Sequence, residues 1–253
     1  MALLDEARVR LMSDNGARGP VVVRRGDVLT PSARSWLREH RVEVVFPQGE
    51  PPKEEATRGG QRPAPRYRTL FGAALEEKPE HMTHLKGNVL VFKDHPRIVF
   101  RGWIDLLEAE LLLCQQTCAG AGYRDLTEEL GEALAFVRRC IRYDVLEEPV
   151  GELRLCGMGP DELRERSHYP EKWYGQPHFL PAHGDGPALL AVNKVRTVAR
   201  QTELAAYRAF RDENGAVARE DILLGLNRLS SLMWIFMIRL KAGAYGPPAG
   251  GAQ

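Results

Sequence analysis

The chain of 253 residues is long enough for one large domain or for a helical bundle with a smaller appendage, and its 43% hydrophobic content suffices for a core. Its 35 Lys and Arg residues nearly balance 34 Asp and Glu residues, so the net charge of +1 gives no overall attraction to nucleic acid or to an anionic membrane. We therefore expect a globular protein without a nucleic-acid or membrane partner, in which any phosphate site is a local cluster of cations.

Cysteine usage and hydropathy indicate a reducing compartment and no membrane span. The four cysteines form no CxxC pair and follow no secretory pattern, so we expect a cytoplasmic protein. Cys114 and Cys118 are spaced i, i+4, but no third or fourth ligand accompanies them, which favours buried small residues over a metal site. The longest apolar stretch, 229–240, is shorter than the roughly 20 residues of a membrane span and is interpreted as a buried helix.

Residues 1–46 have the pattern of a small α/β unit. The apolar residues of 1–12 share one helical face and predict a short amphipathic helix, which either packs on its own domain or docks to a partner. The other elements predicted in this unit are a strand at 21–23, a helix from Thr30 to about His40 and a strand at 42–46.

The rest of the chain predicts a mainly α fold. Residues 47–68 contain five prolines and are interpreted as a linker, 69–245 as a helical-bundle domain and 246–253 as a flexible tail. The long helices of the bundle are predicted at about 101–119, 125–146, 187–213 and 218–242. The fold class is thus a bundle of four to five long helices with a small N-terminal α/β appendage.

Between the second and third predicted helices, residues 150–186 are rich in glycine, proline and aromatic side chains. This composition predicts a long loop with one short helix near 160–167. Long ordered loops of this kind usually cover a functional site.

A first candidate cluster runs from Lys93 to Arg97 and continues through Arg101, Gly102 and Asp105. Lys93 and Arg97 stand just before a predicted helix, where two cations could cradle a phosphate group. A solvated basic turn would give the same pattern, so both interpretations stay open on spacing alone.

Two further clusters lie on the third and fourth predicted helices. Arg196, Arg200 and Glu203 have the spacing i, i+4, i+7 and form one charged stripe, which either binds a ligand or forms salt bridges in solvent. Asn227 and Arg228 begin a polar segment, through 231, inside the most hydrophobic helix. Unpaired buried polar groups cost about 1 to 3 kcal/mol each, so this segment requires either a ligand or hydrogen bonds to another helix.

Taken together, the clusters at 93–105, 196–203 and 227–231 resemble, in order and spacing, the three signatures of ATP:cobalamin adenosyltransferases. The segments 29–34 and 83–85, and the Ser-Ser ending of the third cluster, resemble the ethanolamine-utilisation branch of that family. The resemblance covers most of the chain. It implies a ferritin-like helical arrangement and transfer of the 5′-deoxyadenosyl group of ATP to cob(I)alamin, giving adenosylcobalamin and triphosphate.

The resemblance also implies roles for individual residues. Lys93 would contact the ATP phosphates, and Asp105 would pair with Arg196 across a subunit boundary, which requires a homo-oligomer, either a dimer or a trimer. Arg200 and Asn227 would hold the nucleotide. The remaining residues expected to bind substrate are Arg97, Glu203 and Arg228.

For the corrinoid, the resemblance places Phe179 beneath the corrin ring, where it would displace the lower axial ligand of cobalt. Magnesium is expected together with ATP, because it neutralises the phosphates in most ATP enzymes. Cob(I)alamin is itself the nucleophile, so no general base is required. The product would supply ethanolamine ammonia-lyase, with that enzyme or its reactivase as a partner, in the cytoplasm or in a bacterial microcompartment.

The sequence departs from the family in two places. Some members of the ethanolamine branch carry clustered cysteines before the 83–85 segment, but residues 56–79 contain none, so we predict no iron or zinc dependence. Residues 86–88 match the glycine-rich nucleotide loop of the family poorly.

The sequence has two alternative interpretations besides a transferase. A metal-binding ferritin-like bundle needs Glu-x-x-His on two helices, and 165–168 is the one occurrence. A non-catalytic adenosylcobalamin carrier would keep the corrinoid surface and lose the phosphate cations, yet Lys93, Arg196 and Arg200 are present.

Overall fold

In the computed structural model, the chain divides into two compact units, residues 1–62 and 63–253. The structure describes residues 3–14, 20–23, 27–40, 42–45 and 65–246. The predicted linker 47–68 lies outside the described residues as far as residue 64, and its last residues already enter a strand. The predicted tail lies outside the described residues except for Gly246.

The described residues of the first unit form short strands and two helices. Its elements are β1 (Leu3–Leu4), α1 (Glu6–Asp14), β2 (Val21–Val22), β3 (Val28–Leu29), α2 (Pro31–Glu39) and β4 (Val44–Val45). Strand β1 pairs with β3 and β2 pairs with β4, both in parallel. Helix α2 begins as predicted, since the Thr30 side chain accepts a hydrogen bond from the Ala33 amide. The predicted first helix starts at Glu6, because Leu3 and Leu4 form a strand.

The second unit opens with a four-stranded sheet that the sequence patterns did not predict. Its strands are β5 (Tyr67–Thr69), β6 (Ala74–Leu75), β7 (Met82–Lys86) and β8 (Val89–Phe92), in the order β6-β5-β8-β7. Strands β7 and β8 form an antiparallel hairpin that turns at Gly87, which has a φ of 53°. The loop 86–88 is therefore a hairpin turn, and the domain predicted as a helical bundle begins with strands.

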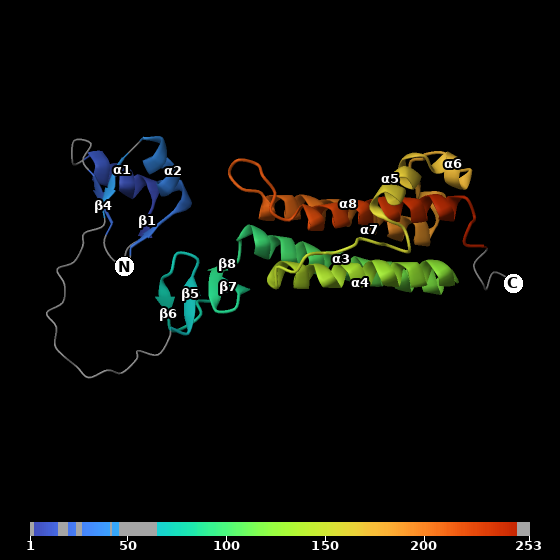
Figure 1. Cartoon of the computed structure of the whole chain (residues 1–253), viewed down its shortest axis with the longest axis horizontal. Helices are drawn as coiled ribbons and strands as arrows, with labels where there is room; N and C mark the ends of the chain where they lie inside the picture. The colour runs from blue at the N-terminus through green and yellow to red at the C-terminus, as the bar shows by residue number, and fades with distance from the viewer. Residues whose placement is uncertain (1–2, 15–19, 24–26, 41, 46–64, 247–253) are drawn as a thin grey trace. The chain divides into compact units, whose positions relative to one another are not determined.

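Four long helices form the bundle, in agreement with the predicted number (Figure 1). They are α3 (Pro96–Gly120), α4 (Arg124–Val145), α7 (Pro187–Phe210) and α8 (Glu220–Lys241). Helix α3 packs on α4 and α7, and α7 packs on α8. Between α4 and α7 the chain forms α5 (Pro160–His168), α6 (Pro170–Tyr174) and the 3₁₀ turn η1 (His183–Asp185).

The start of α3 differs from the prediction. The helix begins at Pro96 rather than near Arg101, because the His95 side chain caps it by accepting a hydrogen bond from the Arg97 amide. Arg97, Arg101 and Gly102 are consequently helical residues, and the basic turn contains only the residues before Pro96.

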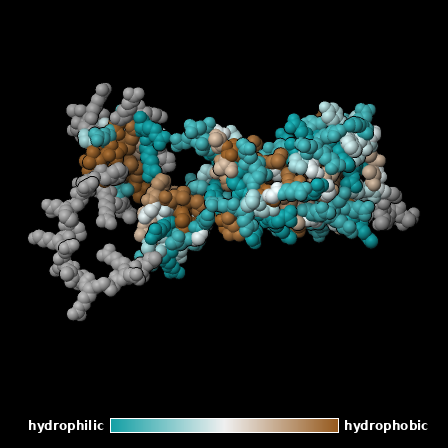
Figure 2. Space-filling model, viewed as in Figure 1, coloured by the Kyte–Doolittle hydropathy of each residue, from teal (hydrophilic) through white to brown (hydrophobic). Residues whose placement is uncertain are grey.

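Helix α8 is the apolar helix that the sequence predicts to be buried. Its length and composition would allow it to cross a membrane, but 67% of its most apolar window is buried inside the bundle. Leu226, Leu229 and Met233 are fully buried in the core shared with the other long helices. Figure 2 shows mostly hydrophilic side chains over this face of the bundle, with small hydrophobic patches between them.

A buried ionic cluster joins the sheet to the bundle. The carboxylate of Asp144 near the end of α4 is fully buried and accepts hydrogen bonds from Arg97 Nε and Arg101 Nε, each at 2.6 Å. Arg101 Nη2 also donates to the Leu85 carbonyl oxygen of β7, at 2.7 Å. One carboxylate thus fixes α4, the first turns of α3 and the edge of the sheet.

Removing this carboxylate tests the cluster. The change Asp144→Ala leaves Arg101 without a counter-charge and Arg97 with only the more distant Glu147, at 3.8 Å, so it should lower the free energy of unfolding by about 3 to 5 kcal/mol, measured by urea denaturation. The control is Glu148→Ala, because Glu148 pairs with Arg142 in solvent, with exposed fractions of 39% and 63%. Equal stabilities of the two variants would contradict the proposed role of Asp144.

A close helix contact generates a second prediction. A Cβ at Gly225 of α8 would lie 2.5 Å from Cζ of Phe136, a buried ring of α4. Gly225→Ala should therefore destabilise the protein by about 1 to 3 kcal/mol. Gly102→Ala on α3 is the matched control, since nothing lies within 4 Å of its Cβ position. Thermal unfolding should show Gly102→Ala to be neutral or stabilising by about 0.5 to 1 kcal/mol.

Candidate active site

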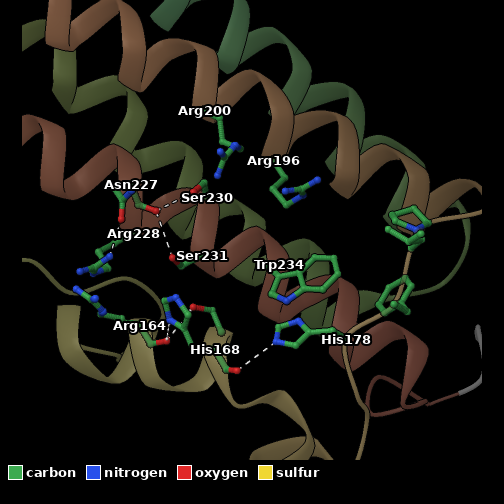
Figure 3. Close-up of a pocket in the computed structure, with 14 residues that line it drawn as sticks. Arg164, His168, His178, Arg196, Arg200, Asn227, Arg228, Ser230, Ser231 and Trp234 are labelled. Carbon is green, nitrogen blue, oxygen red and sulfur yellow. Dashed lines mark hydrogen bonds between the residues drawn. The ribbon is translucent and has the colours of Figure 1, made fainter.

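A pocket of about 630 Å³ lies between helices α5, α7 and α8 and the segment 178–181 (Figure 3). Helix α5 and this segment both belong to the region 150–186 that was predicted to cover a site. The pocket brings together five residues that the sequence singled out, Phe179, Arg196, Arg200, Asn227 and Arg228. The third and fourth long helices therefore supply most of the predicted site.

Four guanidinium groups line the pocket, from Arg196 and Arg200 of α7, Arg228 of α8 and Arg164 of α5. No carboxylate is among the described lining residues. Burial and the charge of Arg200 lower the pKa of Arg196, and burial and the charge of Arg164 lower the pKa of Arg228. Burial is the first cause at both groups, and the charges of Asp161 and Glu203 oppose it at Arg228 without reversing it, so a polyanion would stabilise both cations.

Asn227 links the two helices that carry these cations. Its amide Nδ2 donates to Glu203 Oε1 of α7 at 3.0 Å, and its Oδ1 accepts from Arg228 Nη1 at 2.6 Å. The hydroxyl groups of Ser230 and Ser231 donate to its main-chain oxygen. Arg228 Nε is buried without a partner among the described residues. The polar segment of α8 thus makes an interhelical hydrogen bond and still presents an unpaired donor.

A second part of the pocket lining is aromatic. The Trp234 ring stacks on the Phe179 ring, with centroids 5.2 Å apart, and on the His178 ring, with centroids 5.8 Å apart. The Arg196 guanidinium lies 5.6 Å from the Trp234 ring centroid, and its Nε and Nη2 both donate to Asn193 Oδ1 at 3.1 Å. An apolar wall suited to a flat ring therefore adjoins the cationic wall.

Arg164, His168, His178 and Trp234 are pocket residues that the sequence patterns missed. His178 Nε2 donates to the His168 carbonyl oxygen at 3.1 Å, and His168 Nδ1 donates to the Arg164 carbonyl oxygen at 2.8 Å. The first bond holds the segment 178–181 to helix α5, and the second lies within α5. The aromatic composition of 150–186 was the available signal, whereas nothing in the sequence relates Trp234 to Phe179.

Four predicted residues lie outside the pocket lining, and one of them, Glu203, reaches it only through its hydrogen bond with Asn227. Lys93 is exposed and donates to Glu80 Oε1 at 3.1 Å. Arg97 is bound to the buried carboxylate of Asp144, which gives its guanidinium a structural role that the sequence did not predict. Asp105 lies exposed on α3.

The described residues contain no group of three or more His, Cys, Asp or Glu side chains placed to hold a metal ion. In the Glu-x-x-His segment, Glu165 pairs with Lys172 at 2.7 Å, and His168 is bound to a main-chain oxygen. Within the described part of the chain, a di-iron arrangement therefore has no ligand set.

Residues 73–240 match the family of cobalamin adenosyltransferases. A relative described as corrinoid adenosyltransferase EutT, from Salmonella typhimurium strain LT2, is 32% identical over 229 residues, which cover 83% of this chain and 81% of the relative. The protein of the same description from Escherichia coli K12 is 31% identical over 227 residues, with the same coverage.

The cationic wall predicts binding of a free polyanion. Arg200→Gln should weaken binding of inorganic triphosphate about 10-fold or more, since it removes charge-assisted hydrogen bonds. Isothermal titration calorimetry measures the affinity, and Arg208→Gln is the control, because Arg208 lies exposed on the same helix outside the pocket lining. Equal losses in both variants would mean that the pocket arginines act only through overall charge.

Proposed function

Since this chain belongs to the cobalamin adenosyltransferase family, we propose that it transfers the 5′-deoxyadenosyl group of ATP to cob(I)alamin, releasing triphosphate. The observation that carries this proposal is the pocket in which four guanidinium groups, with no carboxylate among the described lining residues, adjoin an aromatic wall. One wall suits the triphosphate of ATP and the other suits a flat macrocycle.

The proposed reaction needs few protein groups. The electron pair of Co(I) attacks the ribose C5′, a cobalt–carbon bond forms, and the C5′–O bond breaks with its electron pair going to the triphosphate. No proton is abstracted, so a general base is unnecessary. The departing charge is what the protein has to stabilise, and preorganised cations do this effectively where water is excluded.

Arg196 and Arg200 would hold the triphosphate, together with Arg228 and Arg164, and the shared pocket of the four side chains supports this role. Asn227 would contact the nucleotide, and Glu203 would act through Asn227 by fixing its amide orientation. Because Arg196 also lies against Trp234, the phosphate and corrin contacts are adjacent in the pocket.

Phe179 would lie beneath the corrin ring. Its ring stacks on Trp234, and the neighbouring Leu180 is 91% exposed, so an apolar surface is available to a large ligand. Removing the lower axial ligand lowers the energy of the orbital that accepts the electron, and an apolar face excludes both that ligand and water. Phe179 would in this way favour formation of Co(I).

Lys93 and Asp105 are proposed to complete the site of another subunit, in a dimer or a trimer. Asp105 is exposed on α3, where a second copy could present its Arg196. Arg97 is proposed to support the segment that carries Lys93, because its own guanidinium is bound to Asp144.

Magnesium is proposed to enter with the nucleotide. Magnesium prefers oxygen ligands, and the described pocket lining has no carboxylate. The lining residues therefore do not fit a magnesium site held by protein side chains. The proposed absence of iron and zinc dependence follows from the cysteine-free segment 56–79.

The product would supply ethanolamine ammonia-lyase, directly or through its reactivase. The sequence resemblance to the ethanolamine branch and the likeness to the two EutT relatives support this role. The proposed site of action is the cytoplasm or a bacterial microcompartment within it, which fits the free cysteines.

Anaerobic spectroscopy tests the proposal. Protein, magnesium, ATP and chemically reduced cobalamin should convert Co(I) to a light-sensitive alkylcobalamin. Arg196→Ala should lower kcat/KM about 100-fold or more, since it removes a cation that stabilises the leaving group. Arg208→Ala on the same helix should retain activity, because its side chain is exposed outside the pocket lining.

The same experiment separates the alternative. Tight corrinoid binding without turnover by the unaltered protein would identify a carrier of adenosylcobalamin. Absence of both binding and turnover would contradict the transferase and the carrier together.

A further inference from the structure

Helix α8 faces the segment 178–185 at two points. Trp234 and Lys241 are seven residues apart, close to two helical turns, so they lie on the same side of α8. We call residues 178–185 the strap, since they run from the pocket to η1 just before helix α7. Apart from η1 the strap has no regular secondary structure, so its contacts with other elements determine its position.

Lys241 contacts the strap in two places. Its ammonium group forms an ion pair with Asp185 and also lies 5.5 Å from the centroid of the Phe179 ring. The same ring lies 5.2 Å from the Trp234 ring. Phe179 is therefore held by two α8 side chains, one aromatic and one cationic.

Asp185 anchors the C-terminal end of the strap. One carboxylate oxygen pairs with Lys241, and the other, Oδ2, accepts a hydrogen bond from the Ala182 amide at 2.7 Å. Its side chain is only 6% exposed, although the surrounding strap residues are mostly exposed. The hydrogen bond from Lys241 is the main cause that lowers the pKa of Asp185, so the carboxylate stays charged and paired.

We propose that Lys241 is a positioning residue, which holds the strap against α8 and presets the Phe179 ring for the flat apolar face of the corrinoid. The identity of that ligand rests on the proposed function. A preset ring lowers the ordering cost that binding would otherwise include. Without the ammonium group, the strap would lose its ion pair to α8 and keep the stacking on Trp234 and the hydrogen bond from His178 to His168.

The chain offers a matched control. Lys172 of α6 makes the same two kinds of contact, an ion pair with Glu165 at 2.7 Å and a cation–π contact 5.3 Å from the Trp173 ring. It does not line the pocket. Lys172→Met therefore removes an equivalent lysine that has no contact with Phe179, and Lys241→Arg is the conservative variant that keeps the charge.

Hydrogen exchange of the ligand-free protein is the first measurement. Lys241→Met should speed exchange of the Ala182 amide and of the neighbouring strap amides about 5-fold, whereas Lys172→Met should leave them unchanged and Lys241→Arg should restore most protection. Unchanged strap exchange in Lys241→Met would overturn the proposal, as would an equal effect of Lys172→Met.

Steady-state kinetics provides the second measurement. Lys241→Met should raise the KM for cobalamin about 5-fold and leave the KM for ATP unchanged, because only the corrinoid face is affected. A loss shared equally by both substrates would indicate a general structural role and would contradict positioning. If the unaltered protein does not adenosylate cobalamin, the proposed function fails, and hydrogen exchange still decides the role of Lys241.

Discussion

The packing of α8 on α7 is the contact on which the candidate site depends. Helix α8 buries Leu226, Leu229 and Met233 in the core, so its polar residues at 227–231 are forced to the side that faces α5 and the pocket. The hydrogen bond from Asn227 to Glu203 fixes how the two helices align along their axes. That alignment brings arginines that are far apart in the sequence into one wall, and the apolar core keeps the wall rigid.

Arginines elsewhere in the bundle differ from those of the pocket. Arg97 and Arg101 share the buried Asp144, Arg219 pairs with Asp221, and Arg239 pairs with Glu129. The described pocket lining offers no such carboxylate. Arg196 and Arg228 are half-buried and form no ion pair among the described residues, so part of the cost of burying their charges is not offset within one subunit. A triphosphate would bring negative charge to this wall and offset part of that cost.

Helical periodicity was enough to predict the four long helices and to place Arg196, Arg200 and Asn227 on them. The sheet β5–β8 was not predicted, because its strands have two to five residues. That is too few to show a clear alternation of apolar and polar side chains. The early start of α3 was missed because a histidine caps the helix. The partners of Arg97 and Trp234 could not be predicted either, since Asp144 and Phe179 lie tens of residues away in the sequence and meet them only after the helices pack.

Helix α8 carries Arg228 of the cationic wall, with Asn227 next to it, and also Trp234 and Lys241, which contact Phe179 of the aromatic wall. A rise of 1.5 Å per residue separates Asn227 from Trp234 by about 10 Å along the axis. The helix therefore fixes the spacing between the two walls through its regular hydrogen-bonded geometry rather than through loops. Inserting or deleting one residue between them would rotate one set of side chains by about 100° relative to the other. During evolution, this stretch of α8 can change its side chains, but it can hardly change its length.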